Sequence, residues 1–408
     1  MRPRAAGWRR NQFAVTAASF VGFTGFTLVM PFLPLYIRQL GVTDVGEIAL
    51  WTGVTLGVTP ALTALCSPFW GRVADRYGHK LMVERALVSF VVVMTAMAFV
   101  TRAWHLFALR AALGLFAGYG ALTLSMAARS VPRERMAQAI GLVQTAQRLG
   151  PALGPVIGGV LAPLVGLRRA FLVSAAFYAL AFLVVLFLYD ESPEPVRTRE
   201  ERGGRVTFGN IMALENFLLL MVVIFGLQMV DRSFGPVLPL YVQELGIARE
   251  QVPLVSGVLF SALAFAAALG HHLAGRLLRR LPARAVIASA AVVGAVALAA
   301  IAARPPAAVL VAAIAVLGAC IGAASTSAYT AAGAVIPAEV HGTGFSLLTS
   351  ASLVGLALSP VVSGFVAARS IRLVFVGGAV ALVVLAVLVR RVMVERAPTA
   401  RTVQESEF

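Results

Sequence analysis

Charged side chains are scarce in this chain of 408 residues, in which Asp, Glu, Lys and Arg together make up 13%; about 25% is usual for soluble domains. The charges are also bunched, and between the bunches lie apolar stretches of roughly 20 residues, the length that crosses a hydrocarbon core about 30 Å thick. Apolar residues supply 59% of the chain. The pattern excludes a soluble protein and predicts an all-α protein embedded in the lipid bilayer.

Acidic residues are fewer than basic ones, 18 against 34, which gives a formal net charge of +16. Such a charge can indicate nucleic-acid binding. Here, however, the arginines lie at the ends of the apolar stretches, where they act as orientation signals at a membrane surface. We therefore expect the lipid bilayer, and no nucleic acid, as a partner.

Cysteine is nearly absent: Cys66 and Cys320 lie far apart within apolar stretches, which excludes a disulfide framework and a metal-binding spacing. The sequence also lacks G-x-S-x-G, H-E-x-x-H and the phosphate-binding G-x-x-x-x-G-K-[ST]. We expect no metal, no cofactor and no enzyme activity. Without a nucleotide site, any transport must draw its energy from an ion or substrate gradient.

The apolar stretches predict twelve membrane spans. Their residues are 12–38, 49–70, 82–101, 104–128, 137–164, 168–189, 209–243, 252–275, 284–302, 306–334, 342–368 and 371–389. The longest polar stretch separates the sixth span from the seventh. It divides the chain into an N-terminal six-helix bundle (1–190), a cytoplasmic linker (191–208) and a C-terminal six-helix bundle with a short cytoplasmic tail (209–408).

Arginine and lysine are distributed unevenly over the loops. If the N-terminus is inside, 22 of the 34 basic residues lie in inside segments and 8 in outside segments, and the remaining 4 lie within spans. Positive charge accumulates on the cytoplasmic side of membrane proteins. The distribution predicts a multi-pass protein with both termini in the cytoplasm.

The sequence contains an internal repeat. Residues 31–41 (PFLPLYIRQLG) recur as residues 236–246 (PVLPLYVQELG), 205 positions later, with seven of eleven positions identical. The same offset carries Gly150, Pro155 and Gly159 onto Gly355, Pro360 and Gly364. One register held over several motifs predicts two copies of one six-helix fold, related by a pseudo-two-fold axis along the membrane normal.

Residues 71–80 (GRVADRYGHK) join the second and third spans and place one acid among cations. The residues that define this motif are Gly71, Arg72, Asp75, Arg76, Gly78 and Lys80. Such a cluster can form a latch that must break when the two halves move. The alternative is a positively charged inside loop with a stray acid, and spacing does not separate the two.

Residues 150–159 (GPALGPVIGG) lie in the fifth span. Three glycines at intervals of four make a smooth strip that lets another helix approach closely. This strip is either a static packing seam or, as we prefer, a surface at which helices slide or hinge. The motif residues are Gly150, Gly154, Pro155, Gly158 and Gly159.

These motifs resemble the major facilitator superfamily over nearly the whole chain. Residues 71–80 match its loop motif G-x-x-x-D-R-x-G-R/H-K. Residues 150–159 match G-x-x-x-G-P-x-x-G-G, the fifth-helix signature of its twelve-helix drug–proton antiporter branch. The resemblance implies that Asp75 and its arginines stabilise the outward-open state, and that the strip seals the interface between the halves. Leu106-xxx-Arg110-xxx-Gly114 is similar to the fourth-helix motif whose arginine is implicated in proton transfer.

The chain departs from the family pattern in two places. Family members often place an acid three residues before the proline that opens the loop between the fourth and fifth helices, where this chain has Arg129. The latch is therefore expected to lack one carboxylate. Leu113 and Phe116 replace the polar or small residues common around the arginine of the fourth helix, which weakens the assignment of Arg110.

Charges inside a membrane span are costly and by default functional candidates. Asp231 and Arg232 lie within the seventh span, where the repeat places uncharged Phe26 and Thr27. We take Asp231, Arg110 and Arg232 as candidates for proton coupling, because burial favours the neutral form of a carboxyl group. The alternatives are a structural Asp–Arg pair and, for Arg110, an arginine whose head group reaches the membrane surface.

Further polar or aromatic residues inside spans are candidates for a substrate cavity, although they form no specific recognition pattern. They are Gln144, Gln147, Arg148, Gln228, Phe234, Tyr119 and Tyr329.

The pattern as a whole favours a secondary active transporter of the inner cell membrane. We expect it to export a small lipophilic or cationic, drug-like compound in exchange for protons by alternating access, and to work as a monomer. One alternative is an uptake symporter or facilitator for a small metabolite or sugar. A receptor that transports nothing is a weaker alternative, because it has no need of the charges in the spans.

Overall fold

The computed structural model describes residues 4–132, 135–191, 214–337 and 341–394, and all regular structure in these ranges is helical. The helices of the first half are α1 (Arg4–Thr27), η1 (Met30–Phe32), α2 (Leu33–Gln39), α3 (Val45–Tyr77), α4 (His79–Met97), α5 (Ala103–Leu115), α6 (Tyr119–Ser130), α7 (Met136–Val165) and α8 (Leu167–Leu188). Those of the second half are α10 (Phe217–Arg232), α11 (Phe234–Glu244), α12 (Val252–Leu277), α13 (Ala283–Ala302), α14 (Ala307–Val335), α15 (His341–Ala367) and α16 (Ile371–Val392). The predicted linker lies almost wholly outside the described residues, so the domain boundaries stay a prediction.

Eleven segments of the described chain are long and apolar enough to cross a membrane. The predicted third span is α4, which has the required length but carries Lys80, Glu84 and Arg85 in its first turns. Lys80 and Glu84 lie one turn apart, with Nζ 3.8 Å from Oε1. The protein is therefore a multi-pass membrane protein, and α4 completes the twelve crossings with its charges gathered at one end.

Three spans are broken where the sequence disfavours a continuous helix. The first span is divided into α1, η1 and α2 around Pro31 and Pro34, because proline provides no backbone N–H to the preceding turn. The fourth span is divided at Gly118, whose φ of 114° is accessible to glycine at little cost. The seventh span is divided at Ser233, between α10 and α11. The predicted spans treated each of these as one helix.

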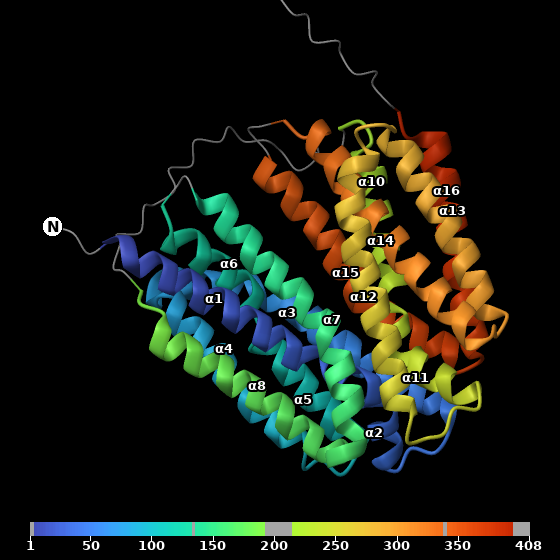
Figure 1. The fold of residues 1–408 in the computed structure, drawn as a ribbon, viewed down its shortest axis with the longest axis horizontal. Helices are drawn as coiled ribbons and strands as arrows, with labels where there is room; N and C mark the ends of the chain where they lie inside the picture. The colour runs from blue at the N-terminus through green and yellow to red at the C-terminus, as the bar shows by residue number, and fades with distance from the viewer. Residues whose placement is uncertain (1–3, 133–134, 192–213, 338–340, 395–408) are drawn as a thin grey trace, which may run out of the picture.

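The helices form two bundles (Figure 1). Helices α1 to α8 pack among themselves, as do α10 to α16, and the main contacts between the bundles are α3 with α15 and α7 with α12. We call the side on which α1 begins and α16 ends the terminal side, and the side that carries α2 and α11 the far side. In Figure 1 the bundles meet near α2 and α11 and spread apart toward the terminal side.

Candidate functional site

Asp231 lies at the end of α10, about halfway along the seventh span, which runs from Phe217 to Glu244. Its Oδ2 is 3.0 Å from Nε of Arg232, and the two side chains are 18% and 46% exposed. The carboxylate is thus largely withdrawn from solvent while its arginine partner remains accessible. The Asp231–Arg232 pair, which was predicted from the sequence as the alternative to a role in proton coupling, is therefore formed.

Other polar side chains of the second half gather near Asp231. Gln228, one turn earlier on α10, donates from Nε2 to Oγ of Ser352 on α15 at 3.0 Å. Tyr329 on α14 interacts with the same hydroxyl. These groups leave the wall of the second bundle hydrogen-bonded but only partly buried.

Arg148 on α7 reaches across from the first bundle. Its Nη1 lies 2.9 Å from Nε2 of His271 on α12, and Nδ1 of His271 lies 2.8 Å from Oγ1 of Thr326 on α14. Asp231 is close enough to act electrostatically on His271. We name this group the central polar cluster; it consists of Arg148, Gln228, Asp231, His271, Thr326, Tyr329 and Ser352.

The remaining cavity candidates lie elsewhere. Gln147 donates from Nε2 to the Gly120 carbonyl at 3.0 Å and to Oγ1 of Thr123 at 3.1 Å, so it joins α7 to α6 within the first bundle. Gln144 is exposed on α7. Their roles in a cavity stay predictions.

The two remaining aromatic candidates, unlike Tyr329, are packed into the cores of the bundles. Tyr119 is 5% exposed and contacts the rings of Phe23 and Phe90. Phe234 is 1% exposed and packs against Phe375. In this conformation both rings stabilise a bundle rather than line an opening.

Arg110 on α5 is fully buried. Its guanidinium lies 6.0 Å from the centre of the Phe26 ring and is close to Tyr178, and its Nε and Nη2 have no hydrogen-bond partner among the described residues. Full burial excludes the alternative in which this arginine extends to the membrane surface. The structure does not join Arg110 to Asp231, which pairs with Arg232.

The motif of residues 71–80 lies on the terminal side, between α3 and α4. Gly78 has a φ of 100°, which allows the tight reversal between the two helices. Oδ1 of Asp75 is 3.4 Å from Nη2 of Arg129 on α6 and 3.7 Å from Nε2 of His79. Arg129, the departure from the family pattern, is thus a direct partner of the motif's acid. Arg76 stacks on its neighbour Tyr77.

The same loop is fixed to the end of α8 by two charged side chains. The Glu191 carboxylate accepts the backbone N–H groups of His79 at 2.7 Å and Lys80 at 3.2 Å, which caps the first turn of α4. In return, Nζ of Lys80 donates to the carbonyls of Leu186 at 3.0 Å and Tyr189 at 2.7 Å. All of these contacts lie within the first bundle.

The glycine strip of α7 has two different faces. A Cβ added to Gly150 or Gly154 would collide with the backbone of α1, and one added to Gly158 with the backbone of Leu28, the residue after α1. These three glycines therefore pack segments of one bundle together. Gly159 instead faces the second bundle, where a Cβ would lie 2.5 Å from the Pro253 carbonyl oxygen on α12.

The two bundles touch closely at two related crossings. A Cβ added to Gly257 of α12 would lie less than 3.0 Å from the Pro155 carbonyl oxygen on α7. A Cβ added to Gly53 of α3 would lie less than 3.0 Å from the Pro360 carbonyl oxygen on α15. Pro155 and Pro360 are equivalent positions of the repeat. Both crossings belong to the far-side halves of their helices, so the bundles are tightly closed on the far side.

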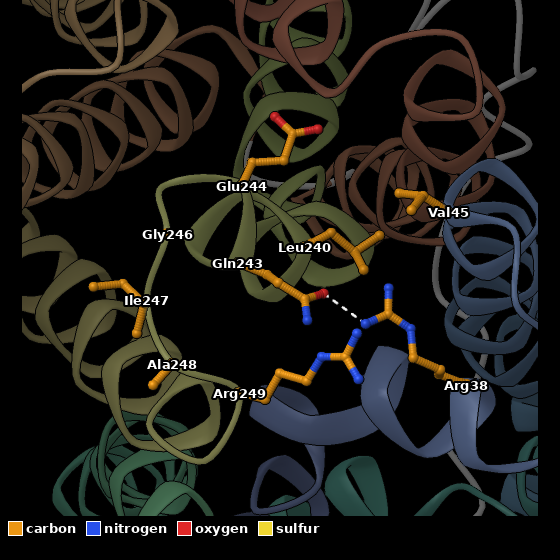
Figure 2. A pocket seen from close by; sticks show the side chains of 9 residues that line it. All are labelled: Arg38, Val45, Leu240, Gln243, Glu244, Gly246, Ile247, Ala248 and Arg249. Carbon is orange, nitrogen blue, oxygen red and sulfur yellow. Dashed lines mark hydrogen bonds between the residues drawn. The ribbon is translucent and has the colours of Figure 1, made fainter.

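Beyond these crossings, a pocket of about 500 Å³ opens on the far side (Figure 2). Arg38 and Val45 line it from the first bundle; the rest of the lining comes from α11 and the loop that follows, including Gln243 and Arg249. Nη1 of Arg38 donates to Oε1 of Gln243 at 2.8 Å. Figure 2 shows the guanidinium groups of Arg38 and Arg249 directed toward one another.

The model of the Major Facilitator Superfamily matches this chain over residues 15–303 and 217–408. The chain belongs to that superfamily. Curated relatives named Multidrug resistance protein MdtG include those of Proteus mirabilis, 34% identical over 69% of this chain and 70% of the relative, and Dickeya zeae, 36% identical over 69% of each.

Solved structures of Major Facilitator Superfamily transporters have the same fold. A bacterial homologue of the human lysosomal transporter Spinster, in an inward-facing and occupied conformation, superposes with a TM-score of 0.79 over 95% of this chain and 98% of that one, at 18% identity. A D323A mutant of the nucleoside transporter NupG gives 0.73 over 93% and 99%, at 14% identity. The expectations of a superfamily member, of two pseudo-symmetric six-helix bundles and of a transporter rather than an enzyme are confirmed.

The sequence motifs predicted candidate residues but not all of the partners that the structure gives them. Glu191 was not predicted because it lies outside the loop motif that it caps. Thr326 and Ser352 were missed because single hydroxyls are common in apolar helices. For His271, in the inner half of the eighth span, the sequence allows a proton relay but favours a solvated or helix-capping side chain, so it was left out of the candidate residues.

Proposed function

We propose that this secondary transporter exports a small lipophilic or cationic compound in exchange for protons. The observation that carries the proposal is the Asp231 carboxylate, which is 18% exposed in the middle of a span and near polar groups from both bundles. Substrate and coupling-ion sites of such transporters lie near the bilayer midplane, between the repeats. The multidrug names of relatives at 34–36% identity support the substrate class.

The proposed mechanism is competition for Asp231. In this structure the carboxylate is neutralised by Arg232. A proton would cancel the negative charge and release Arg232, whereas a cationic compound would take the place of Arg232 as the partner. Since one carboxylate satisfies either occupant but not both, binding of the proton favours release of the substrate. Arg110, buried in the other bundle, is proposed to support proton transfer by its charge.

The proposed orientation places the terminal side in the cytoplasm of a cell with this protein in its inner membrane, because the sequence segments predicted to be inside hold 22 basic residues and those predicted to be outside hold 8. With this orientation, the glycine crossings close the outer side and the bundles spread toward the cytoplasm. The conformation is then inward-facing, ready to receive a compound from the cell.

The loop motif and the glycine strip are proposed to set the conformational balance. In this conformation the described contacts of Asp75 are all within the first bundle, which fits a latch that engages the second bundle only in the outward-open state. Both walls of the proposed site come from one chain, so we propose that the monomer is the working unit.

The test is dye flux in inside-out membrane vesicles. A cationic fluorescent substrate is supplied together with an imposed proton gradient, and uptake is compared for the wild type, Asp231→Asn and empty membranes. Glu244→Gln is the matched control, since Glu244 belongs to the same span but pairs with Arg304 at 2.8 Å on the far side. We expect uptake that an uncoupler abolishes, that Asp231→Asn abolishes, and that Glu244→Gln retains.

Absence of dye flux above that of empty membranes would contradict the proposal, and so would the following outcomes. Gradient-driven uptake that survives Asp231→Asn would remove Asp231 from proton coupling. Uptake driven in the opposite direction, or equilibration of a metabolite or sugar without a gradient, would favour the symporter or facilitator instead.

A further inference from the structure

The hydrogen bonds of His271 connect the two bundles. On one side of the ring, Nε2 lies 2.9 Å from Nη1 of Arg148, on α7 of the first bundle. On the other side, Nδ1 lies 2.8 Å from Oγ1 of Thr326, on α14 of the second bundle. The imidazole thus links three helices through both of its nitrogens.

The chemistry of the partners fixes where the ring proton lies. A guanidinium group has only donors, so Nε2 must accept from Arg148. A neutral imidazole carries its single proton on the other nitrogen, so Nδ1–H donates to the Thr326 hydroxyl. A second proton, on Nε2, would remove the acceptor and set an imidazolium against the guanidinium. The contact between the bundles therefore requires neutral His271.

The charges around His271 come from different bundles. Arg148 on α7 opposes a second proton, while the Asp231 carboxylate on α10 favours one. Tyr329 on α14 lies near Arg148. Of the other elements packed against α12, η1 has no titratable side chain, and α11 has Tyr241 and Glu244, bonded to Ile301 and Arg304 respectively. Protonation of His271 thus removes its hydrogen bond with Arg148 of the first bundle and strengthens its attraction to Asp231 of the second bundle.

The position of this contact relates it to opening. From Gly159, where α7 meets α12, to Arg148 is 11 residues, or about 16 Å along a helix at roughly 1.5 Å per residue. From Gly257 to His271 is 14 residues, or about 21 Å. The bond therefore lies on the terminal side of the tight crossing, where the bundles spread, and the long arginine side chain spans the gap.

We infer that His271 is a proton-binding site that controls this contact: neutral His271 holds α7 to α12 on the terminal side, and protonated His271 releases it. The released state binds the proton better than the contact state does. Lowering the pH below about 6.5, the usual pKa of histidine, therefore increases the fraction of molecules in the released state. The inference rests on the proposed function only in taking the terminal side as the side that opens.

The experiment measures the distance between spin labels at exposed positions Leu142 on α7 and Leu277 on α12, after replacement of Cys66 and Cys320 by alanine. The protein is placed in lipid nanodiscs between about pH 8 and pH 4.5, without substrate or gradient. We expect the ratio of long to short distances to rise as pH falls, by up to about tenfold per pH unit, the limit for one proton.

His271→Gln retains an acceptor and a donor but does not titrate, so its distances are expected to be independent of pH and wild-type-like at pH 8. Arg148→Gln removes the repulsion and gives a second pH-independent variant should His271→Gln fail to fold. His272→Gln, the next residue on α12, is the matched control and should follow the wild type.

The inference would be overturned if the distances in the wild type did not depend on pH. It would also be overturned if both His271→Gln and Arg148→Gln kept the pH dependence of the wild type. Either result is compatible with dye export through Asp231. Conversely, absence of dye flux together with the expected distance changes would overturn the proposed function and leave the site at His271 standing.

Discussion

Arg38 and Gln243 meet across the two bundles, with Nη1 of Arg38 2.8 Å from Oε1 of Gln243. They are 205 residues apart, which is the offset of the internal repeat. Equivalent positions of two repeats can touch only where the pseudo-two-fold axis passes. This hydrogen bond therefore marks the axis on the far side and contributes to closure there.

Changing the charge at position 243 should change that closure in a predictable direction. Gln243→Glu replaces the neutral acceptor of Arg38 with a carboxylate, and charge-assisted bonds between arginine and a carboxylate are among the strongest hydrogen bonds in proteins. Gln243→Arg sets two guanidinium groups together. Far-side opening is measured by maleimide labelling of Ala49→Cys, a buried position beside Gly364, in protein lacking Cys66 and Cys320. Labelling should slow with glutamate and accelerate with arginine; equal rates would contradict the role in closure.

A methyl group at Gly159 should prevent tight closure of the far side. Its Cβ would lie 2.5 Å from the Pro253 carbonyl oxygen, and overpacking of this kind costs about 1–3 kcal/mol. Gly159→Ala is expected to raise the labelling rate of Ala49→Cys severalfold or more. Gly141→Ala, on the same helix, is the control, because no atom lies within 4 Å of its added Cβ. Similar labelling rates for Gly159→Ala and Gly141→Ala would show that α7 accommodates the methyl group without opening the far side.

Removal of the Glu191 side chain should destabilise the first bundle. The carboxylate caps α4 through the N–H groups of His79 and Lys80, and the loss of such a cap costs about 0.5–2 kcal/mol. We expect Glu191→Ala to lower the thermal unfolding temperature in detergent, whereas Glu250→Ala, exposed on the far side, should leave it unchanged. An equal decrease of the unfolding temperature in both variants would indicate that the change in net charge, and not the loss of the cap, causes the effect.

His79 should make the stability of the terminal side depend on pH. Burial, followed by the charge of Arg129, lowers the pKa of this histidine at the first residue of α4. The folded state therefore binds the proton less readily than the unfolded state, whose value is about 6.5. Stability is then retained above that value and lost as pH falls below it. The unfolding temperature should decrease less between about pH 8 and pH 5 in His79→Gln than in the wild type, and His105→Gln should follow the wild type.

The spans could be predicted because their lengths and apolar character are local properties of the sequence. The internal breaks of the spans were harder to predict. Gly118 divides the fourth span through its positive φ, and the sequence does not distinguish it from the neighbouring Gly114 and Gly120. The Asp231–Arg232 pair was predictable because the residues are adjacent. The Arg148–His271 contact was not, since its partners are 123 residues apart and belong to different halves.

The loop motif of residues 71–80 shows what a motif can predict and what it cannot. The sequence predicted that Arg129 would cost the latch a carboxylate, but not that this cation would become a partner of Asp75 at 3.4 Å. A motif names the residues of a loop; which helix ends surround that loop depends on the packing of the whole bundle.

The paired glycine crossings carry an evolutionary consequence. In each, a glycine of one repeat receives the carbonyl of the proline of the other, Gly257 with Pro155 and Gly53 with Pro360. A single six-helix ancestor with one such glycine and one such proline would make the same contact twice on forming an isologous homodimer. Fusion of two such subunits into one chain would preserve that contact and leave the residues on the axis free to differ. Arg38 and Gln243 differ in this way, whereas identical subunits would set arginine against arginine or glutamine against glutamine at that position.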